Sequence, residues 1–128
     1  MRLKVTPMQN VMIVDDEALV LLDLVHTVED LGYAIHSEST SVDGALASLD
    51  KETPDLALLD IDVAGEPVWP VARELTSKGV PVIFVSANLS HKELCQEFSD
   101  CPKLEKPASP TDIGRALEMA GEIKSCAA

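Results

Sequence analysis

Polar side chains that can bind metal and phosphate follow several of the most apolar runs of this sequence. Asp15 and Asp16 follow "NVMIV", Asp60 follows "LALL", Ser86 ends "VPVIFVS", and Lys106 follows "CPKLE". Clustered carboxylates repel one another and call for a divalent cation, and Mg²⁺ prefers oxygen ligands. Once that charge is neutralised, one carboxylate can attack a phosphoryl group and become an acyl phosphate, while an ammonium and a hydroxyl hold phosphoryl oxygens.

Each of these residues also has an ordinary structural explanation when it is taken alone. Asp15 is a typical turn residue, Ser86 a typical cap, and Lys106 a typical solvated surface charge. An aspartate directly after a buried strand, such as Asp60, is most often a turn former. The functional interpretation therefore depends on whether the fold brings these side chains to one place.

The elements that must position them alternate along the chain. Apolar stretches indicate strands at 11–14, 33–39, 55–60, 80–86 and 101–106, and helical patterns follow at 17–32, 41–49, 68–79, 90–98 and 109–124. A strand–helix unit repeated in this way predicts a doubly wound α/β fold with a parallel sheet. The carboxyl ends of parallel strands lie at one edge of the sheet, so the polar residues are expected to converge there.

Local signals predict how the helices start, end and face the core. The first helix is expected to end at Gly32 and to bury a face formed by Ala18, Leu21, Leu22, Val25 and Val28. Ser41 and Ser109 are expected to cap the second and fifth helices. Ser90 and Glu93 have the spacing of a capping box at the start of the fourth helix.

The composition describes one acidic domain with an aliphatic core. The 128 residues predict a single domain over 8–125, and aromatic residues make up only 3% of a chain that is 46% hydrophobic. The chain has 22 acidic and 10 basic residues, for a net charge of −12. Such a surface repels phosphate backbones, which argues against nucleic-acid binding.

No leader or membrane span is expected from the sequence. The first ten residues lack the apolar core of a signal peptide, and "ALVLLDLV" is interrupted by Asp23 and too short to cross a bilayer. Neither the cysteines nor the histidines have metal-ligand spacing: Cys95, Cys101, Cys126, His26, His36 and His91. These features predict a cytoplasmic protein with reduced thiols and no membrane attachment.

Taken in order, "VMIVDDE", "PDLALLDI", "VPVIFVSA" and "LEKP" resemble the receiver domains of two-component response regulators, and the resemblance covers essentially the whole chain. It implies a flavodoxin-like (βα)5 fold whose five-stranded parallel sheet has the order 2-1-3-4-5. It also implies a phosphoacceptor domain of a phosphorelay, and not an enzyme that turns over other substrates. Such a domain at most catalyses its own phosphorylation and dephosphorylation.

The resemblance implies that Asp60 is the phosphoacceptor. The phosphoryl group would come from a histidine of a sensor kinase or of a histidine phosphotransfer protein. Ser86 and Lys106 match the residues that contact the phosphoryl group, and the bond between Lys106 and Pro107 is expected to be cis.

The same resemblance implies a Mg²⁺ site built from oxygen ligands. Asp16 would bind the ion directly, and Asp15 directly or through water, together with Asp60. Asp62 matches the position whose backbone carbonyl completes the site, so its own side chain is not required.

Several positions depart from the usual receiver pattern. The fifth strand has Lys103 where Tyr or Phe commonly acts as an aromatic switch. "FVSAN" is similar to an atypical subgroup with the pattern Phe-Ala-Thr-Gly-aromatic, but Asn88 stands at the aromatic position, and Ala64 replaces a usual proline. Signalling is therefore expected to run through Ser86 and reordering of "NLSHKELCQEF".

The output is expected to be a protein contact. The matched pieces leave no room for an output domain within the chain, so the receiver would act on an unidentified protein target. The expected contact surface is formed by the fourth helix, the fifth strand and the fifth helix, and it includes Lys103.

Two other interpretations remain open at this stage. "LLDIDVA" is similar to the Asp-x-Asp motif of haloacid dehalogenase-like phosphatases, in which Asp62 would act as the general acid/base. Alternatively, the chain is a pseudo-receiver that binds a partner without being phosphorylated. Substitution of Asp62 distinguishes the first alternative, because it should abolish phosphatase turnover and spare receiver phosphorylation.

Overall fold

The computed structural model describes residues 9–127 of the chain. In chain order the elements are β1 (Asn10–Val14), α1 (Ala18–Asp30), β2 (Ala34–Ser39), α2 (Val42–Lys51), β3 (Leu56–Leu59), β4 (Asp62–Val63), β5 (Glu66–Pro67), α3 (Trp69–Ser77), β6 (Val82–Ser86), α4 (Lys92–Cys95), β7 (Lys103–Glu105) and α5 (Pro110–Ala127). Residue 8, where the predicted domain begins, and the side chain of Cys126 lie outside the described part.

The main sheet is parallel and has the strand order β2-β1-β3-β6-β7. Counted along the chain, this is the predicted order 2-1-3-4-5, and the flavodoxin-like fold class is confirmed. The residues of β3 and β6 are all buried, as expected for strands covered by helices on both faces. The strand order reverses between β1 and β3, and ligands of open α/β sheets bind at such a switch point.

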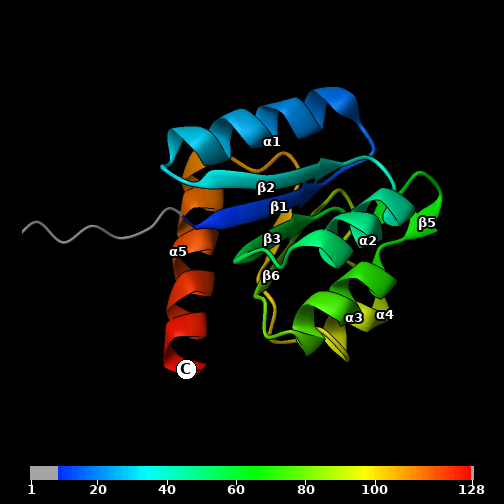
Figure 1. Cartoon of the computed structure of the whole chain (residues 1–128). Helices are drawn as coiled ribbons and strands as arrows, with labels where there is room; N and C mark the ends of the chain where they lie inside the picture. The colour runs from blue at the N-terminus through cyan, green and yellow to red at the C-terminus, as the bar shows by residue number, and fades with distance from the viewer. Residues whose placement is uncertain (1–8, 128) are drawn as a thin grey trace, which may run out of the picture.

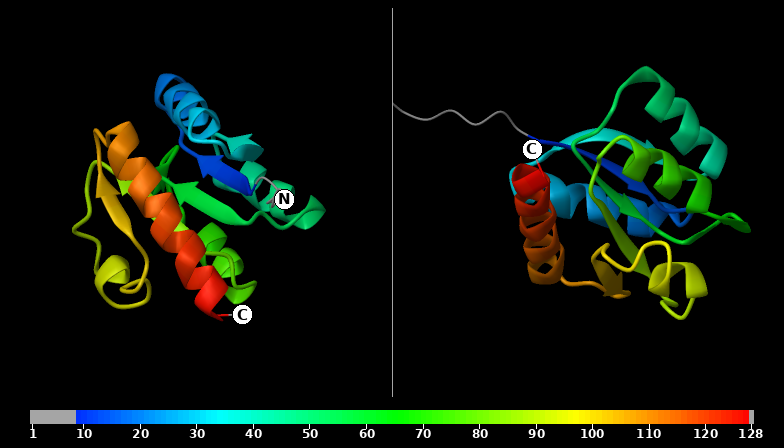
Figure 2. Two further views of the ribbon diagram at one scale, coloured as in Figure 1. Left: turned by 90° about the vertical axis from the view of Figure 1, so that its left-hand side faces the viewer. Right: turned by 90° about the horizontal axis from the view of Figure 1, so that it is seen from below.

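Helices cover both faces of the sheet (Figures 1 and 2). Helices α1 and α5 pack on one face, and α2, α3 and α4 pack on the other. Side chains alternate along β1, so Val11 and Ile13 join the core under α1 and α5, whereas Met12 and Val14 join the opposite core. Both cores are mainly aliphatic, and the core under α2, α3 and α4 also contains Trp69.

The predicted helix ends are largely confirmed. Ser41 Oγ accepts a hydrogen bond from Gly44 N–H at 3.0 Å, and Ser109 Oγ accepts one from Asp112 N–H at 3.1 Å. Gly32 follows α1 with φ of 96°, a left-handed conformation that glycine adopts without steric cost.

The buried face of α1 differs from the prediction at two positions. Ala18 is exposed and Leu22 is 49% exposed, whereas Leu24 and Thr27 are buried instead. The apolar run that includes Leu19 and Leu22 is wider than one helix face, so the pattern alone did not select the stripe that meets the sheet.

The predicted capping box at the start of α4 is wrong. His91 is the N-cap residue and makes no side-chain cap. Ser90 Oγ instead donates to Asn88 Oδ1 at 2.6 Å, and its own N–H donates to the same oxygen at 3.0 Å. Because this local bond occupies Ser90, the helix begins at Lys92 and ends at Cys95.

Candidate functional site

The carboxyl ends of the central strands carry the predicted site residues. Asp60 N–H donates to Val14 O at 2.9 Å, and Lys106 N–H donates to Ser86 O at 2.9 Å. These backbone bonds extend the strand ladders past the ends of β3 and β7. The side chains of Asp60 and Lys106 therefore lie at the same edge of the sheet, close to the switch point between β1 and β3.

Lys106 joins the ends of two strands. Its Nζ donates to Asp15 Oδ2 at 2.6 Å and to Asp60 Oδ2 at 3.0 Å. The side chains of Asp15 and Asp60 are 1% and 9% exposed, and that of Lys106 is 16% exposed. Asp15 Oδ1 also accepts from Glu17 N–H at 2.9 Å, and Asp60 Oδ1 accepts from Ile61 N–H at 2.7 Å. Both buried carboxylates are thus oriented by two hydrogen bonds each.

Burial and ion pairing act in opposite directions on the pKa values of Asp15 and Lys106. Burial raises the pKa of the Asp15 carboxyl, although its hydrogen bonds from Lys106 and from the Glu17 N–H favour the charged form. Burial alone would lower the pKa of Lys106, but hydrogen bonds to Asp15 and Asp60 and their negative charges raise it overall. Lys106 is therefore a cation at neutral pH.

Asp16 completes a cluster of carboxylates. One ligand oxygen each from Asp15, Asp16 and Asp60 lies within 4.8 Å of the others, and Asp16 is exposed to solvent. The ammonium of Lys106, which bonds Asp15 and Asp60, offsets one of these three negative charges, and the remaining negative charge favours a divalent cation. The oxygen-only donor set suits Mg²⁺, which typically keeps several waters. The residues present therefore fit Mg²⁺.

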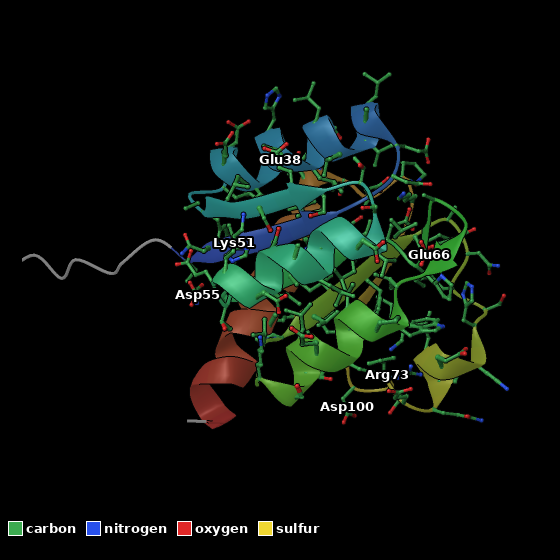
Figure 3. The ribbon with its side chains drawn as sticks, turned by 45° about the vertical axis from the view of Figure 1, so that its right-hand side comes forward. Glu38, Lys51, Asp55, Glu66, Arg73 and Asp100 are labelled. Carbon is green, nitrogen blue, oxygen red and sulfur yellow. The ribbon has the colours of Figure 1, made fainter. Side chains whose placement is uncertain are left out.

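A hairpin that the sequence did not predict lies beside this cluster. The prediction had a loop here, but β4 and β5 pair in antiparallel fashion, Asp62 with Pro67 and Val63 with Glu66. Ala64 and Gly65 form the two-residue turn with φ of 53° and 82°, as hairpin turns of this length require. The hairpin lies at one rim of the molecule, where Glu66 is labelled (Figure 3).

The hairpin contacts the acidic cluster directly. Ala64 N–H donates to Asp16 Oδ2 at 2.9 Å. The Asp62 side chain is exposed, and the expected role of its backbone carbonyl stays a prediction. No strand signal was visible in "DVAGEP" because each paired segment has only two residues.

The cluster opens into a cavity of about 430 Å³. Its lining residues are Asp16, Glu17, Asp60, Asp62, Ser86, Ala87, Asn88, His91 and Lys106. Ser86 is buried, and its Oγ accepts from Asn88 N–H at 3.4 Å. The fold therefore brings Asp60, Ser86 and Lys106 to one cavity, as the sequence predicted. The cavity also includes His91, which the search for metal-ligand spacing did not identify because Asp16 and Asp60 are distant from it in sequence.

A second, more apolar cavity of about 510 Å³ adjoins the same lysine. It lies between α1 and the segment after β7, and Leu19, Val20, Lys106 and Pro107 are among its lining residues. Leu19 is 81% exposed. The Lys106–Pro107 peptide bond at this cavity is cis, as predicted.

The chain matches the family model of the response regulator receiver domain over residues 11–118. The chain belongs to this family. The matched range contains every strand of the main sheet apart from Asn10, the first residue of β1, and it includes Asp15, Asp60, Ser86 and Lys106. Receivers are signalling domains of two-component systems. They receive signals from kinases or phosphotransfer proteins, and they typically bind Mg²⁺.

Curated relatives are response regulators of greater length. The chain is 30% identical over 115 residues to the transcriptional regulatory protein PdtaR of Mycobacterium tuberculosis, covering 88% of this chain and 56% of the relative. It is 36% identical to the positive alginate biosynthesis regulatory protein of Pseudomonas aeruginosa, covering 87% of this chain and 46% of the relative. The chain thus spans about half the length of these relatives.

Solved structures of other proteins have the same fold. The signal receiver domain of a modulated diguanylate cyclase from Desulfovibrio desulfuricans superposes with a TM-score of 0.85 at 25% identity, covering 95% of this chain and 100% of the other. SdrG of Sphingomonas melonis superposes with a TM-score of 0.74 at 30% identity, covering 87% and 94%. In the described residues of this chain, no helix combines the length and apolar character needed to cross a membrane.

Proposed function

We propose that this receiver accepts a phosphoryl group on Asp60 from a phosphohistidine of a sensor kinase or a phosphotransfer protein. The observation that carries the proposal is the position of the Lys106 ammonium, 3.0 Å from Asp60 Oδ2, in a cavity that both residues line together with Ser86. An ammonium fixed beside a buried carboxylate suits a site where negative charge is added and must be held.

In the proposed reaction, a carboxylate oxygen of Asp60 attacks the phosphorus atom of phosphohistidine. The phosphorus–nitrogen bond breaks as the oxygen–phosphorus bond forms, and the imidazole leaves with the electron pair. The product is an acyl phosphate on Asp60. Asp15, Asp16, Asp60 and the Asp62 carbonyl would hold Mg²⁺, which when bound would supply positive charge to neutralise the phosphoryl oxygens. Phosphoryl transfer requires chiefly positioning and charge stabilisation, which these residues offer.

Lys106 and Ser86 have separate tasks in this scheme. Lys106 already bonds Asp15 and Asp60, so a phosphoryl oxygen can take the place of one of these carboxylate contacts. Ser86 Oγ accepts only a long bond from Asn88 N–H, and its hydroxyl can donate to another phosphoryl oxygen.

The donor protein is proposed to approach across α1. Leu19 is 81% exposed and Leu22 is 49% exposed, and Leu19 lines the apolar cavity that adjoins Lys106. Exposed leucines beside a reactive group favour a protein contact. The proposed location of the protein is the cytoplasm, as the sequence predicts.

Intact-protein mass spectrometry after incubation with acetyl phosphate tests the proposal. The wild type should gain one phosphoryl group in the presence of Mg²⁺, and neither the metal-free protein nor Asp60→Asn should gain it. A phosphohistidine donor is the second arm, because it reports on receivers that do not accept small donors. If folded, Mg²⁺-loaded protein stays unmodified with both donors, the proposal fails and the pseudo-receiver interpretation replaces it.

A further inference from the structure

Lys103 occupies the usual position of the aromatic switch, and its ammonium forms hydrogen bonds with nearby backbone carbonyls. Its Nζ donates to Cys101 O at 2.7 Å and to Ser99 O at 3.3 Å. These bonds hold the ammonium against the backbone that leads from α4 into β7. The side chain therefore stabilises its own loop, and a different connection must link the cavity to the molecular surface.

The segment after β6 is attached to the site through Ser86. Asn88 N–H donates to Ser86 Oγ, and Asn88 Oδ1 in turn accepts from the N–H and the hydroxyl of Ser90. The next residue, His91, is the N-cap of α4. A change in the position of the Ser86 hydroxyl would break the first of these bonds and release the chain as far as His91.

His91 links that segment to the interior. Its ring lines the cavity with Asp60 and Ser86, and it packs edge-on against Trp69 with ring centroids 5.7 Å apart. Among the buried side-chain nitrogens and oxygens that the structure describes, only His91 Nδ1 has no hydrogen-bond partner. Packing against Trp69, and not a hydrogen bond at this nitrogen, therefore holds the ring.

Trp69 belongs to a compact aromatic cluster. It stacks on Phe98 with centroids 5.6 Å apart and meets Phe84 edge-on at 5.9 Å, and Phe84 and Phe98 are 5.4 Å apart. These residues come from α3, β6 and the turn after α4. Close-packed rings transmit displacement because there is little free volume between them.

The cluster lies beneath a surface ion pair. Arg73 lies on the side of α3 that faces α4 (Figure 3), and its guanidinium donates to both carboxylate oxygens of Glu97, at 2.7 and 2.9 Å. Glu97 is adjacent in sequence to Phe98. A movement of Phe98 therefore changes the geometry of this exposed pair.

We infer that His91 is a positioning residue that connects the phosphoacceptor cavity to the Trp69–Phe84–Phe98 cluster, so that phosphorylation is reported at the surface between α3 and α4. The inference rests on the proposed phosphorylation of Asp60. Ser86 turns toward the phosphoryl group and releases Asn88, the segment that ends at His91 shifts, and the ring of His91 moves against Trp69. The affected surface carries Arg73 and Glu97 and differs from the predicted surface that includes Lys103.

Trp69 is the only tryptophan of the chain and gives a direct readout. The experiment measures its emission before and after incubation with acetyl phosphate and Mg²⁺, and the phosphoryl content of the same samples by intact mass. The wild type should show an emission change in proportion to phosphoryl content. His91→Ala should show less than half of that change per phosphoryl group, whereas His91→Phe, which keeps a ring against Trp69, should restore it.

Two controls test whether the loss of response is specific to His91 and whether the variants are folded. His36→Ala removes a histidine that bonds Ser37 and Glu52 away from the cavity, and it should keep the full response. Far-UV circular dichroism checks that each variant is folded. The wild-type response in phosphorylated His91→Ala would overturn the inference while leaving the proposed function intact. Absence of any phosphoryl gain in the wild type would overturn both, and the mass spectrum identifies that case without reference to fluorescence.

Discussion

The ammonium of Lys106 lies 2.6 Å from Asp15 Oδ2, although the two residues are 91 positions apart in the sequence. The same nitrogen bonds Asp60, so one cation neutralises part of the charge at the ends of two central strands. The carboxylates of Asp15 and Asp60 are almost fully buried, and water screens their mutual repulsion only weakly. Lys106 is therefore expected to stabilise the metal-free fold in addition to its proposed contact with the phosphoryl group.

Lys106→Met should lower the free energy of unfolding by about 2–4 kcal/mol in metal-free buffer, because it leaves buried carboxylates without their cation. Urea denaturation in the presence of a chelator measures the loss. Lys78→Met is the matched control: its partner Glu74 lies at 3.3 Å in an exposed pair, and its removal should cost about 0.5 kcal/mol or less. Equal losses in the two variants would contradict a structural role for Lys106.

The convergence of the site was predictable from the alternation of strands and helices. Asp15 and Asp60 each follow a continuous apolar strand, Ser86 ends another, and Lys106 follows the short strand β7. Parallel strands place their carboxyl ends at one edge of the sheet. The apolar pattern of the sequence predicted where β1, β3 and β6 end, because a strand buried on both faces is apolar along its length and the first polar residue marks its end.

Features set by only a few residues were not predictable. The hairpin of β4 and β5 depends on the positive φ of Ala64, a residue type that gives no turn signal. The exposure of Leu22 depends on how α1 is rotated on the sheet, and its sequence has more leucines than one face can bury. The position of His91 depends on the Ser90–Asn88 bond, which overrode the capping-box pattern.

The pH dependence of stability should reveal the burial of Asp15. Burial raises the pKa of this carboxyl in the folded state, so the folded protein holds the proton more tightly than the unfolded chain does. The resulting stabilisation is fully present below the unfolded pKa of about 3.9 and is lost as the pH rises through the folded pKa. Asp15→Asn removes this dependence, so in metal-free buffer its stability relative to the wild type should increase with pH.

Urea denaturation of both proteins between about pH 4.5 and pH 7 measures this difference. Asp23→Asn, at an exposed position on α1, is the control and should show a much smaller change across the same range. A relative stability of Asp15→Asn that stays constant or falls as the pH rises would show that burial does not dominate the titration of Asp15.

Mg²⁺ should stabilise the protein through Asp16 and not through the side chain of Asp62. At a Mg²⁺ concentration 100 times Kd, binding raises the free energy of unfolding by about 2.7 kcal/mol. Asp16→Asn should lose most of this effect because it removes a charged ligand from the cluster of three carboxylates. Asp62→Asn should keep it, since only the backbone carbonyl is proposed as a ligand.

Thermal denaturation with and without Mg²⁺ measures the effect, and Ca²⁺ shows whether it is selective. The same Asp62→Asn protein should still gain a phosphoryl group from acetyl phosphate. Loss of the metal effect in Asp62→Asn would place its carboxylate in the site, and phosphatase turnover that depends on Asp62 would favour the haloacid dehalogenase-like alternative.

Leu19→Glu should separate the two kinds of phosphoryl donor. Leu19 is 81% exposed beside the cavity that adjoins Lys106, so a charge there should disrupt a protein interface without touching Asp60. Loss of an interface anchor worth about 1.4 kcal/mol would slow transfer from a phosphohistidine protein about tenfold, while the rate with acetyl phosphate should remain at the wild-type value. Leu31→Glu is the matched control, because Leu31 is 41% exposed just past the other end of α1. Equal effects of the two substitutions on protein donors would mean that net charge, and not contact at Leu19, governs the encounter.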